Sequence, residues 1–437
     1  MIGAPPPCPT WRAAPSRPTP HPVAQGEPLT LCDLTQSYSE VGGGIRTYLH
    51  EKRRYLVEKT PHRHVLIVPG PRDETRIDGR TVTVTIRSPY VPGSTAYRLL
   101  LRNGAVREAL AAHQPDVIET LDAYNLPWAA LRHRRAHPWV AVLGGYRTDF
   151  PRAYVRALGH QAFSKVLPDR FARRLASRAE RTADRYAGML YRRMDAVYAL
   201  SRPRADALEA LGIPNVAVVP LGVDLDTFHP EASDEAMRTS WGVGPRTTPA
   251  RSFAMVYAGR LDQEKRPDLL VEAFEQLPDT LHATLVLVGD GPMRESLERR
   301  AQALRTRGKR VHLSGYVRDR QTLAAVLASA DLYVSAMAHE TFGISILEAQ
   351  ACGLPVFGVR AGAMPDRVPS HLGRLATPDN ATSLAEAIVD IAQEDLEPMR
   401  RAARAHVVDH FGWPATFTCI LDLYDRALSA RRRALQG

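Results

Sequence analysis

Short apolar runs alternate with amphipathic stretches along most of this chain of 437 residues, and no other feature restricts its fold as strongly. In the second half, an apolar run at 253–261 leads into a helical pattern at 266–277, and the same order repeats at 284–291 and 293–304. Strands that alternate with helices in this way pair in parallel, because each helix carries the chain back across a sheet face. The alternation predicts an α/β fold with helices on both faces of parallel sheets.

Further strands are indicated by apolar or alternating runs that end at glycine, proline or polar residues. In the first half these runs lie at 29–34, 64–70, 81–89, 116–122, 139–146, 196–201 and 216–222. In the second half they lie at 310–317, 331–336 and 373–378. Helical patterns are expected at 98–115, within an arginine-rich region at 151–193, at 322–330 and at 383–394.

The chain is too long for one ordinary hydrophobic core. Its two sets of alternating elements predict two Rossmann-like, doubly wound parallel-sheet domains that face each other across a cleft. Proline recurs throughout the first 28 residues and predicts a disordered leader, because proline disrupts helices and sheets. The predicted segments are a leader at 1–28, an N-terminal domain at 29–222, a linker at 223–251, a C-terminal domain at 252–402 and terminal helices at 403–437.

The stretch at 333–357 is the leading candidate for a functional site. It predicts the end of a buried strand, a loop, an amphipathic helix that begins near Ser345, and a second short strand. Glu340 and Glu348 bracket the turn into the helix, and Gly343 gives that turn conformational freedom. Unpaired N–H groups at the start of a helix attract phosphate, while carboxylates accept hydrogen bonds from hydroxyl groups. Phosphate and hydroxyl groups together suggest a sugar nucleotide as the ligand.

Two glycine-containing turns follow other predicted strands. Gly42, Gly43 and Gly44 precede a helical pattern, where they form either a structural turn or a loop that approaches a phosphate or a sugar. Gly289 stands in GDGP, which fits either a plain turn between strand and helix or another close approach to a ligand. Neither turn decides the function by itself.

Two basic residues follow the strand predicted at 253–261. Arg260 and Lys265 stand where open α/β sheets place their ligands, at the carboxyl ends of the strands. A guanidinium and an ammonium at that edge suit a diphosphate, and the alternative is that both are solvated loop charges.

Composition restricts the class of protein. Four scattered cysteines without CxxC spacing, and histidines without paired ligand spacing, indicate neither a disulfide framework nor a metal site. No apolar run approaches the roughly 18 residues that a membrane span needs, and the start lacks the apolar core of a signal peptide. We therefore expect a cytoplasmic protein.

The formal net charge of +10 favours acidic partners, which include nucleotides, anionic lipid and nucleic acid. The arginine-rich region at 151–193 is a solvated face, a surface that binds the acceptor, or a surface for peripheral contact with the anionic inner face of a membrane. Nucleic acid is not expected as a partner, because the arginines lack the interleaved aromatic residues that stack on bases.

Five motifs in one order resemble family 4 of the retaining glycosyltransferases, which have the twin-Rossmann GT-B architecture. The most specific is HETFGISILEAQACGLPV, with seven residues between Glu340 and Glu348. The others are GGG at 42–44, VVPLGVDLDTFHP at 218–230, GRLDQEKRPD at 259–268 and GDGP at 289–292. The resemblance covers about 30–425 and implies a retaining hexosyltransferase that uses a nucleotide sugar of the GDP-mannose or UDP-glucose type. The acceptor would be a glycan, a lipid or a small molecule.

The resemblance also implies roles for individual residues. Arg260 and Lys265 would hold the donor diphosphate, Glu340 would bind hydroxyl groups of the donor sugar, and Glu348 would bind the ribose hydroxyls. The helices at 403–437 would cross back to the N-terminal, acceptor-side domain. The other donor-binding residues that the resemblance implies are Gly42, Gly43, Gly44, Gly289, Thr341, Phe342, Gly343 and Ile344.

In the implied mechanism, the acceptor attacks from the side of the leaving diphosphate, and a phosphate oxygen helps to deprotonate it. No cofactor or obligatory metal is expected. The sequence departs from the family at the strand predicted at 116–122, where many members carry a histidine and this chain has Leu121 and Asp122. Asp122 and Asp149 are the candidate polar contacts on the acceptor side, and Asp366 replaces a glutamate that the family often carries.

Other functions stay open at this point. A sugar-nucleotide epimerase or a phosphorylase with the same architecture would share the donor motifs, and its product would be an epimerised sugar or a sugar phosphate. A non-catalytic glycan-binding protein is compatible with the missing histidine. A basic nucleic-acid-binding protein is compatible with the net charge.

Overall fold

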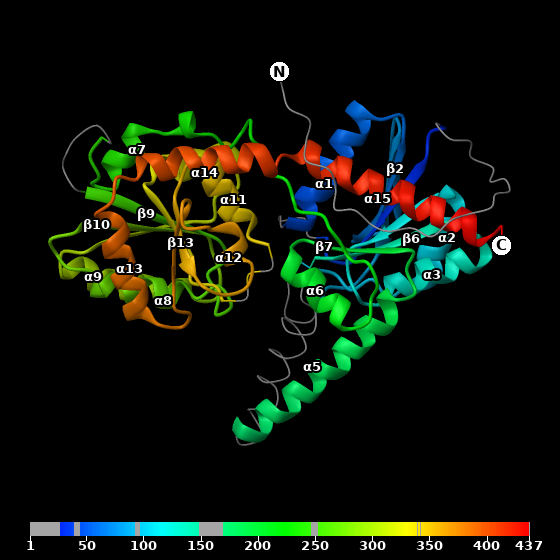
Figure 1. Ribbon diagram of the computed structural model, residues 1–437, viewed down its shortest axis with the longest axis horizontal. Coiled ribbons are helices and arrows are strands. Elements are labelled where there is room, and N and C mark those ends of the chain that lie inside the picture. Colours follow the sequence, from blue (N-terminus) through cyan, green and yellow to red (C-terminus); the bar gives the residue numbers. More distant parts are fainter. Residues whose placement is uncertain are drawn as a thin grey trace. The chain divides into compact units, whose positions relative to one another are not determined.

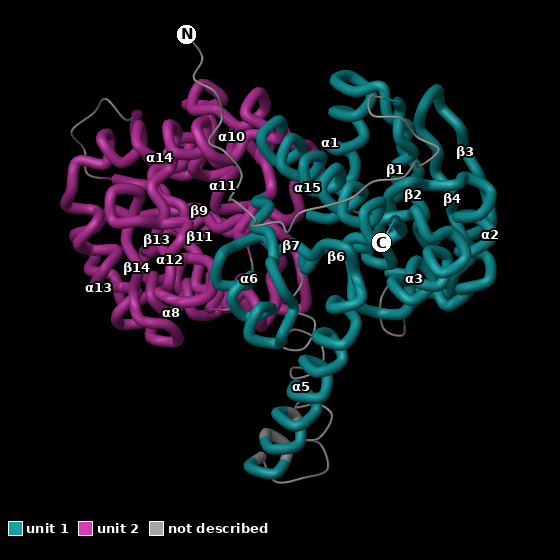
Figure 2. Tube along the Cα trace, turned by 45° about the vertical axis from the view of Figure 1, so that its right-hand side comes forward, with its two compact units in different colours: residues 1–220, 414–437 teal, residues 221–413 magenta. Residues whose placement is uncertain are grey.

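The computed structural model describes residues 27–38, 44–91, 97–147, 169–245, 252–338, 340 and 342–436. The chain forms two compact units, one from residues 1–220 and 414–437 and the other from 221–413 (Figure 2). Each unit contains a sheet with helices on both faces (Figure 1). The fold is therefore two α/β units, as the alternation of strands and helices predicts.

The sheet of unit 1 has eight strands in the order β3-β4-β2-β1-β5-β6-β7-β8, and all neighbours pair in parallel except β3 and β4. The strands are β1 (Thr30–Leu34), β2 (Arg63–Gly70), β3 (Glu74–Asp78), β4 (Thr81–Arg87), β5 (Val117–Thr120), β6 (Ala141–Tyr146), β7 (Ala196–Ala199) and β8 (Ala217–Val218). The helices are α1 (Gly44–Lys59), α2 (Asn103–His113), α3 (Leu126–Ala136), α5 (Asp169–Tyr191), α6 (Arg202–Ala210) and α15 (Trp413–Ala434).

The sheet of unit 2 has six parallel strands in the order β11-β10-β9-β12-β13-β14. The strands are β9 (Ser252–Ala258), β10 (His282–Val288), β11 (Arg310–Gly315), β12 (Leu332–Val334), β13 (Val356–Val359) and β14 (Gly373–Ala376). The helices are α7 (Glu235–Ser240), α8 (Pro267–Gln276), α9 (Arg294–Thr306), α10 (Arg320–Ser329), α11 (Ile344–Ala351), α12 (Met364–Arg367), α13 (Ala381–Ala392) and α14 (Glu397–His410), and Pro230–Ala232 forms a 3₁₀ turn.

Several elements differ from the sequence-based expectation. Strand β3 was not predicted, because almost all of its residues are exposed and they carry no apolar alternation; it pairs antiparallel with β4 at the edge of the sheet. The helix expected at 98–115 is confined to Asn103–His113, and the strand expected at 216–222 to Ala217–Val218. In the described part of the arginine-rich region, α5 covers Asp169–Tyr191 and extends away from the sheet of unit 1 (Figure 1).

Helix α11 is also different from its prediction. It was expected to be amphipathic, but every residue from Ile346 to Ala351 is buried. The reason is that α14 packs against α11, so other parts of the protein cover the helix on the side away from the sheet as well. A helix enclosed in this way is apolar around most of its circumference.

A network of buried polar residues holds α1, the sheet and α15 of unit 1 together. Lys52 of α1 is 1% exposed, and its Nζ lies 2.5 Å from Oδ1 of Asp33 and 2.8 Å from Oε2 of Glu119. The same ammonium donates to the hydroxyl of Tyr424 on α15 at 2.5 Å. The hydroxyls of Tyr198 and Tyr424 both donate to Glu119. Two carboxylates from adjacent strands thus share one lysine, and Tyr424 connects α15 to the same group.

His64 joins this network in one tautomer. The Nε of Arg53 donates to Nδ1 of His64 at 3.2 Å, so the proton of the imidazole is on Nε2, which lies 2.7 Å from Oδ2 of Asp33. Burial lowers the pKa of His64 below its ordinary value, which agrees with a neutral ring. Burial would raise the pKa of Asp33, but Lys52 and His64 outweigh it and hold the pKa well below its ordinary value. Asp33 is therefore a buried, ionised carboxylate.

Candidate active site

Strand order in unit 2 locates the candidate donor site. From its first strand, β9, the order β11-β10-β9-β12-β13-β14 is the 3-2-1-4-5-6 arrangement of doubly wound folds. The order reverses between β9 and β12, which pair directly through Val256 and Tyr333. Ligands of such sheets bind outside the carboxyl ends of the strands at the reversal. The loops after β9 and β12 contain the two parts of the predicted site, Arg260 with Lys265 and the segment around Glu340.

The loops after β9 and β12 meet at Lys265 and Glu340. Nζ of Lys265 lies 3.2 Å from Oε2 of Glu340, and the other carboxylate oxygen accepts the backbone N–H of Gly343 at 3.0 Å. Burial alone would raise the pKa of Glu340, but Lys265 and the N–H groups of Phe342 and Gly343 lower it below its ordinary value. The structure therefore brings together two of the predicted site residues and gives them opposite charges.

Gly343 connects Glu340 to the start of α11. Its φ is +82°, in the left-handed region, and a Cβ would lie 2.6 Å from Cδ1 of Ile346. The N-cap residue is Gly343 itself, which has no side chain to cap the helix, and the helix begins at Ile344, one residue before the predicted start. Helix starts of this kind present backbone N–H groups to an anion. The turn thus places a helix N-terminus next to the Lys265–Glu340 pair.

Arg260 has a different environment. Its side chain is 64% exposed and forms ion pairs with Asp262 and Glu264 of its own loop. Its backbone is fixed by the hydroxyl of Tyr257, which donates to the carbonyl of Arg260 at 2.8 Å. The guanidinium is therefore close to the reversal point but is held by neighbouring carboxylates, so a role on the donor diphosphate stays a prediction.

Glu348 is buried on α11 and paired with a residue that the sequence did not single out. Oε1 of Glu348 lies 3.1 Å from a guanidinium nitrogen of Arg320, the first residue of α10. Burial raises the pKa of Glu348 above its ordinary value, although Arg320 acts in the opposite direction. Glu348 thus forms its ion pair with Arg320, whereas Glu340 forms its ion pair with Lys265.

Two tyrosines near the carboxyl ends of β9 and β12 support this region. The hydroxyl of Tyr333 donates to the carbonyl of Ala258 at 3.2 Å and bonds with Oγ of Ser345 at 2.9 Å. Burial raises the pKa of both Tyr257 and Tyr333, so both phenols keep their protons. Tyr333 links the end of β9 with the start of α11, and Tyr257 holds the loop that follows β9. Sequence reasoning missed both, although a tyrosine near the end of each strand at the reversal point was an available signal.

The backbone packing around Gly289 leaves no room for a Cβ atom. Its φ is +142°, and a Cβ at this position would lie 1.8 Å from the carbonyl oxygen of Gly259. The N–H of Gly259 in turn donates to the carbonyl of Val288 at 2.9 Å. This packing of two backbones shapes the loop that carries Arg260, and the approach of Gly289 to a ligand stays a prediction.

In unit 1 the sheet order reverses between β1 and β5, and Asp122 lies at this point. Its buried carboxylate accepts the N–H of Gln36 at 2.6 Å and the hydroxyl of Thr35 at 3.0 Å. Burial raises the pKa of Asp122, and these hydrogen bonds oppose the rise. Asp122 therefore ties the loop after β1 to the loop after β5, and its contact with substrate stays a prediction.

Gly44 begins α1 and has open space where a Cβ would project. Asp366 is exposed on α12, whose preceding residues pack on the backbone of Glu340 through the N–H of Ala363 at 2.8 Å. Gly42, Gly43, Asp149 and Thr341 lie outside the described residues.

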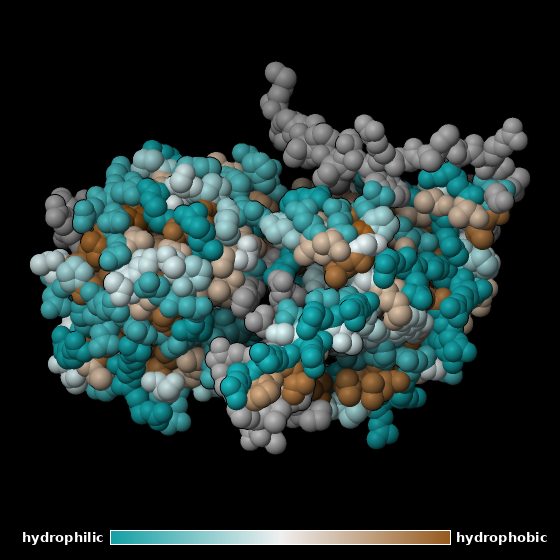
Figure 3. Space-filling model, turned by 60° about the horizontal axis from the view of Figure 1, so that its bottom comes forward, coloured by the Kyte–Doolittle hydropathy of each residue, from teal (hydrophilic) through white to brown (hydrophobic). Residues whose placement is uncertain are grey.

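The described residues contain no group of three or more side chains that could hold a metal ion, and metal independence stays a prediction. None of the described helices has an apolar stretch long enough to cross a bilayer. On the face drawn in Figure 3 hydrophilic residues predominate, and the apolar ones form small groups.

Two family models match the chain in succession. Residues 42–227 match Glycosyltransferase Family 4, and residues 246–406 match Glycosyl transferases group 1. A GDP-mannose-dependent alpha-(1-6)-phosphatidylinositol dimannoside mannosyltransferase of Mycobacterium tuberculosis is 30% identical over 407 residues, which cover 92% of this chain and 98% of that protein. A D-inositol 3-phosphate glycosyltransferase of Saccharomonospora viridis is 33% identical over 229 residues, which cover 50% of this chain and 51% of that protein.

Solved structures agree on the fold. Sucrose-phosphate synthase from Thermosynechococcus elongatus matches with a TM-score of 0.70 and 22% identity, over 92% of this chain and 100% of that one. Anabaena HepE, solved in complex with UDP, matches with a TM-score of 0.67 and 19% identity, over 91% of this chain and 100% of that one. Two doubly wound units with these structural neighbours define the GT-B fold. The chain belongs to glycosyltransferase family 4, and the protein is a retaining hexosyltransferase that uses a nucleotide-sugar donor.

Proposed function

We propose that this protein transfers mannose from GDP-mannose to a phosphorylated, inositol-containing lipid. The observation that carries the proposal is the similarity to the phosphatidylinositol dimannoside mannosyltransferase, which extends over 92% of this chain and 98% of that protein. The partial relatives act on inositol 3-phosphate by name, which supports an inositol-containing acceptor. The cytoplasmic location and the peripheral contact with an anionic membrane belong to this proposal as predictions.

The geometry of unit 2 supports a mechanism for the donor side. Lys265 and the start of α11 stabilise the negative charge that develops on the diphosphate as the bond to the sugar breaks. Such electrostatic stabilisation is often the largest contribution to catalysis. Glu340 accepts hydrogen bonds from the sugar hydroxyls while it orients Lys265, and Glu348 binds the ribose hydroxyls. The acceptor hydroxyl attacks from the same face and gives its proton to a diphosphate oxygen, so the anomeric configuration is kept.

A transfer assay tests the proposed donor and acceptor. The protein is incubated with GDP-mannose or UDP-glucose and with phosphatidylinositol mannosides, inositol 3-phosphate or no acceptor. We expect mannosylated lipid with an α-linkage, detected by mass spectrometry and NMR. Transfer from UDP-glucose alone, or release of epimerised sugar or sugar phosphate, would contradict the proposal.

Glu348→Gln separates binding from stability. Because burial raises the pKa of Glu348, its ionised form costs stability at a pH above the ordinary carboxyl pKa, and glutamine removes that cost. Thermal unfolding at pH 8 is expected at a temperature no lower than that of the wild type. GDP affinity is expected to fall about tenfold, because charge-assisted hydrogen bonds to the ribose are lost. Exposed Glu386→Gln is the control, and an unchanged GDP affinity in the Glu348 variant would refute the assigned role.

A further inference from the structure

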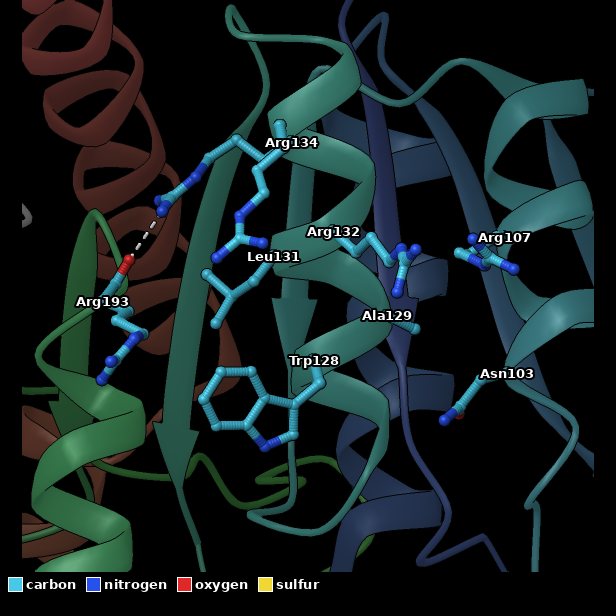
Figure 4. A pocket seen from close by; sticks show the side chains of 9 residues that line it. Asn103, Arg107, Trp128, Ala129, Leu131, Arg132, Arg134 and Arg193 are labelled. Carbon is cyan, nitrogen blue, oxygen red and sulfur yellow. Dashed lines mark hydrogen bonds between the residues drawn. The ribbon is translucent and has the colours of Figure 1, made fainter.

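An arginine-rich pocket lies in unit 1, whereas Lys265 and Glu340 lie in unit 2. Helices α2 and α3 and the turn after α5 form it, and its volume is about 380 Å³. Arg107, Arg132, Arg134, Arg135 and Arg193 line it together with Trp128 (Figure 4). This volume is within the range of small-molecule sites, about 300 to 1,000 Å³.

Of the five arginines, Arg134 is paired with a carboxylate: its side chain is 16% exposed and lies 2.7 Å from Oδ2 of Asp195. The guanidinium groups of the other four arginines have no carboxylate of the described residues within 4.0 Å. Four like charges around one hollow repel one another, and an anion in the hollow would relieve that repulsion.

Arg134 also positions one of the other arginines. Its second guanidinium nitrogen donates to the carbonyl of Arg193 at 2.8 Å, the contact drawn in Figure 4. The guanidinium of Arg193 lies over the ring of Trp128 at 5.6 Å, and the indole N–H of Trp128 donates to the hydroxyl of Tyr186 at 2.9 Å. The Arg134–Asp195 pair thus fixes this wall of the pocket and does not neutralise the charge of Arg193.

On the opposite wall, Arg107 of α2 and Arg132 of α3 point toward the space between the two helices (Figure 4). Oδ1 of Asn103 accepts a hydrogen bond from Asn125 at 2.8 Å, so the amide that Asn103 offers to the pocket is a donor. The polar side chains that line the hollow are therefore donors. Guanidinium groups match the oxygen atoms of a phosphate in paired hydrogen bonds.

We propose that this pocket binds the phosphate group of an anionic ligand, carried either by the headgroup of an anionic phospholipid or by a soluble phosphate monoester. The site is separate from the diphosphate-binding residues predicted in unit 2. It does not depend on the identity of the donor sugar, so failure of the GDP-mannose proposal leaves it unaffected.

The test uses the whole protein and the double variant Arg107→Gln with Arg132→Gln. The matched control is Arg54→Gln with Arg76→Gln, which removes the same charge from exposed positions of unit 1 on α1 and β3. Binding is measured to three probes. They are vesicles in which about one lipid in three is phosphatidylglycerol and the rest is phosphatidylcholine, vesicles of pure phosphatidylcholine, and glycerol 3-phosphate. Thermal unfolding and GDP binding of both variants confirm that the fold is intact.

We expect the pocket variant to lose affinity for the phosphate-bearing probe by about 10- to 30-fold, which corresponds to two basic residues near an anionic surface. The control is expected to change by less than about threefold, because its arginines are exposed and distant charges are screened by salt. Loss confined to the phosphatidylglycerol vesicles identifies a lipid headgroup, and loss for glycerol 3-phosphate identifies a soluble ligand. Equal affinities of the pocket variant and the control for both probes would overturn the proposal.

Discussion

Replacing Lys265 with alanine is expected to lower kcat/KM for sugar transfer by about 10²- to 10³-fold, the loss typical of a removed charge-stabilising group. Lys265 comes from the loop after β9, and its ammonium lies 3.2 Å from Glu340 beside the start of α11. In the variant, Glu340 would face the developing charge of the diphosphate without a cation between them. The effect is expected mainly in kcat, because the charge on the leaving group grows in the transition state.

Steady-state kinetics with saturating acceptor, together with GDP affinity from calorimetry, measure this loss. Lys265→Arg keeps the charge and is expected to retain more activity than Lys265→Ala. Lys59→Ala is the control, because Lys59 is exposed at the end of α1. The loss of one charged hydrogen bond exceeds about threefold in rate. If Lys265→Ala stays within about threefold of the wild type, the proposed catalytic role of Lys265 is wrong.

Replacing Lys52 with methionine is expected to destabilise the protein by about 3–5 kcal/mol, the cost of removing one partner from a buried ion pair. The ammonium of Lys52 neutralises Asp33 and Glu119, and all three side chains are at most 1% exposed. Methionine fills a similar volume but leaves two buried carboxylates without their cation. The hydroxyl of Tyr424 would also lose its contact with Lys52, which loosens α15.

Differential scanning calorimetry at neutral pH measures the change. Because the pKa of Asp33 is lowered, its ion pair contributes stability above the ordinary carboxyl pKa, and this contribution is lost as the pH falls through the folded value. The deficit of the Lys52 variant is therefore expected to shrink in acid. Lys59→Met makes the same chemical change on the exposed side of α1 and is expected to stay within about 0.5 kcal/mol. Equal unfolding temperatures of the two variants would show that the buried network does not stabilise unit 1.

The fold was predictable from local patterns. The apolar runs of β9 and β10 and the amphipathic pattern of α8 are repeated in an order that only parallel sheets with covering helices can satisfy. Strand β3 escaped prediction because its five residues are almost all exposed and carry no alternation. The buried character of α11 escaped it because α14, which covers the helix, is remote in sequence.

The candidate site was predictable in part. The segment from Glu340 to Glu348 could be predicted as a candidate site, because carboxylates, a glycine and a helix start are close together in the chain. The pairing of Glu348 with Arg320 had no sequence signal, because the partners are 28 positions apart on two helices. The close approach of Gly289 to Gly259 likewise depends on the packing of two strand ends.

The sequence by itself determined which residues could form strands and helices, and it predicted which loops form a sugar-nucleotide site, because those properties depend on neighbours within one or two turns. The tertiary structure decided which charges meet. Lys265 reaches Glu340 across 75 positions, and Lys52 reaches Tyr424 across 372. Such pairs form only when strand order and helix packing bring distant segments together, and burial then decides whether a carboxyl pKa rises, as for Glu348, or falls, as for Glu340 and Asp33.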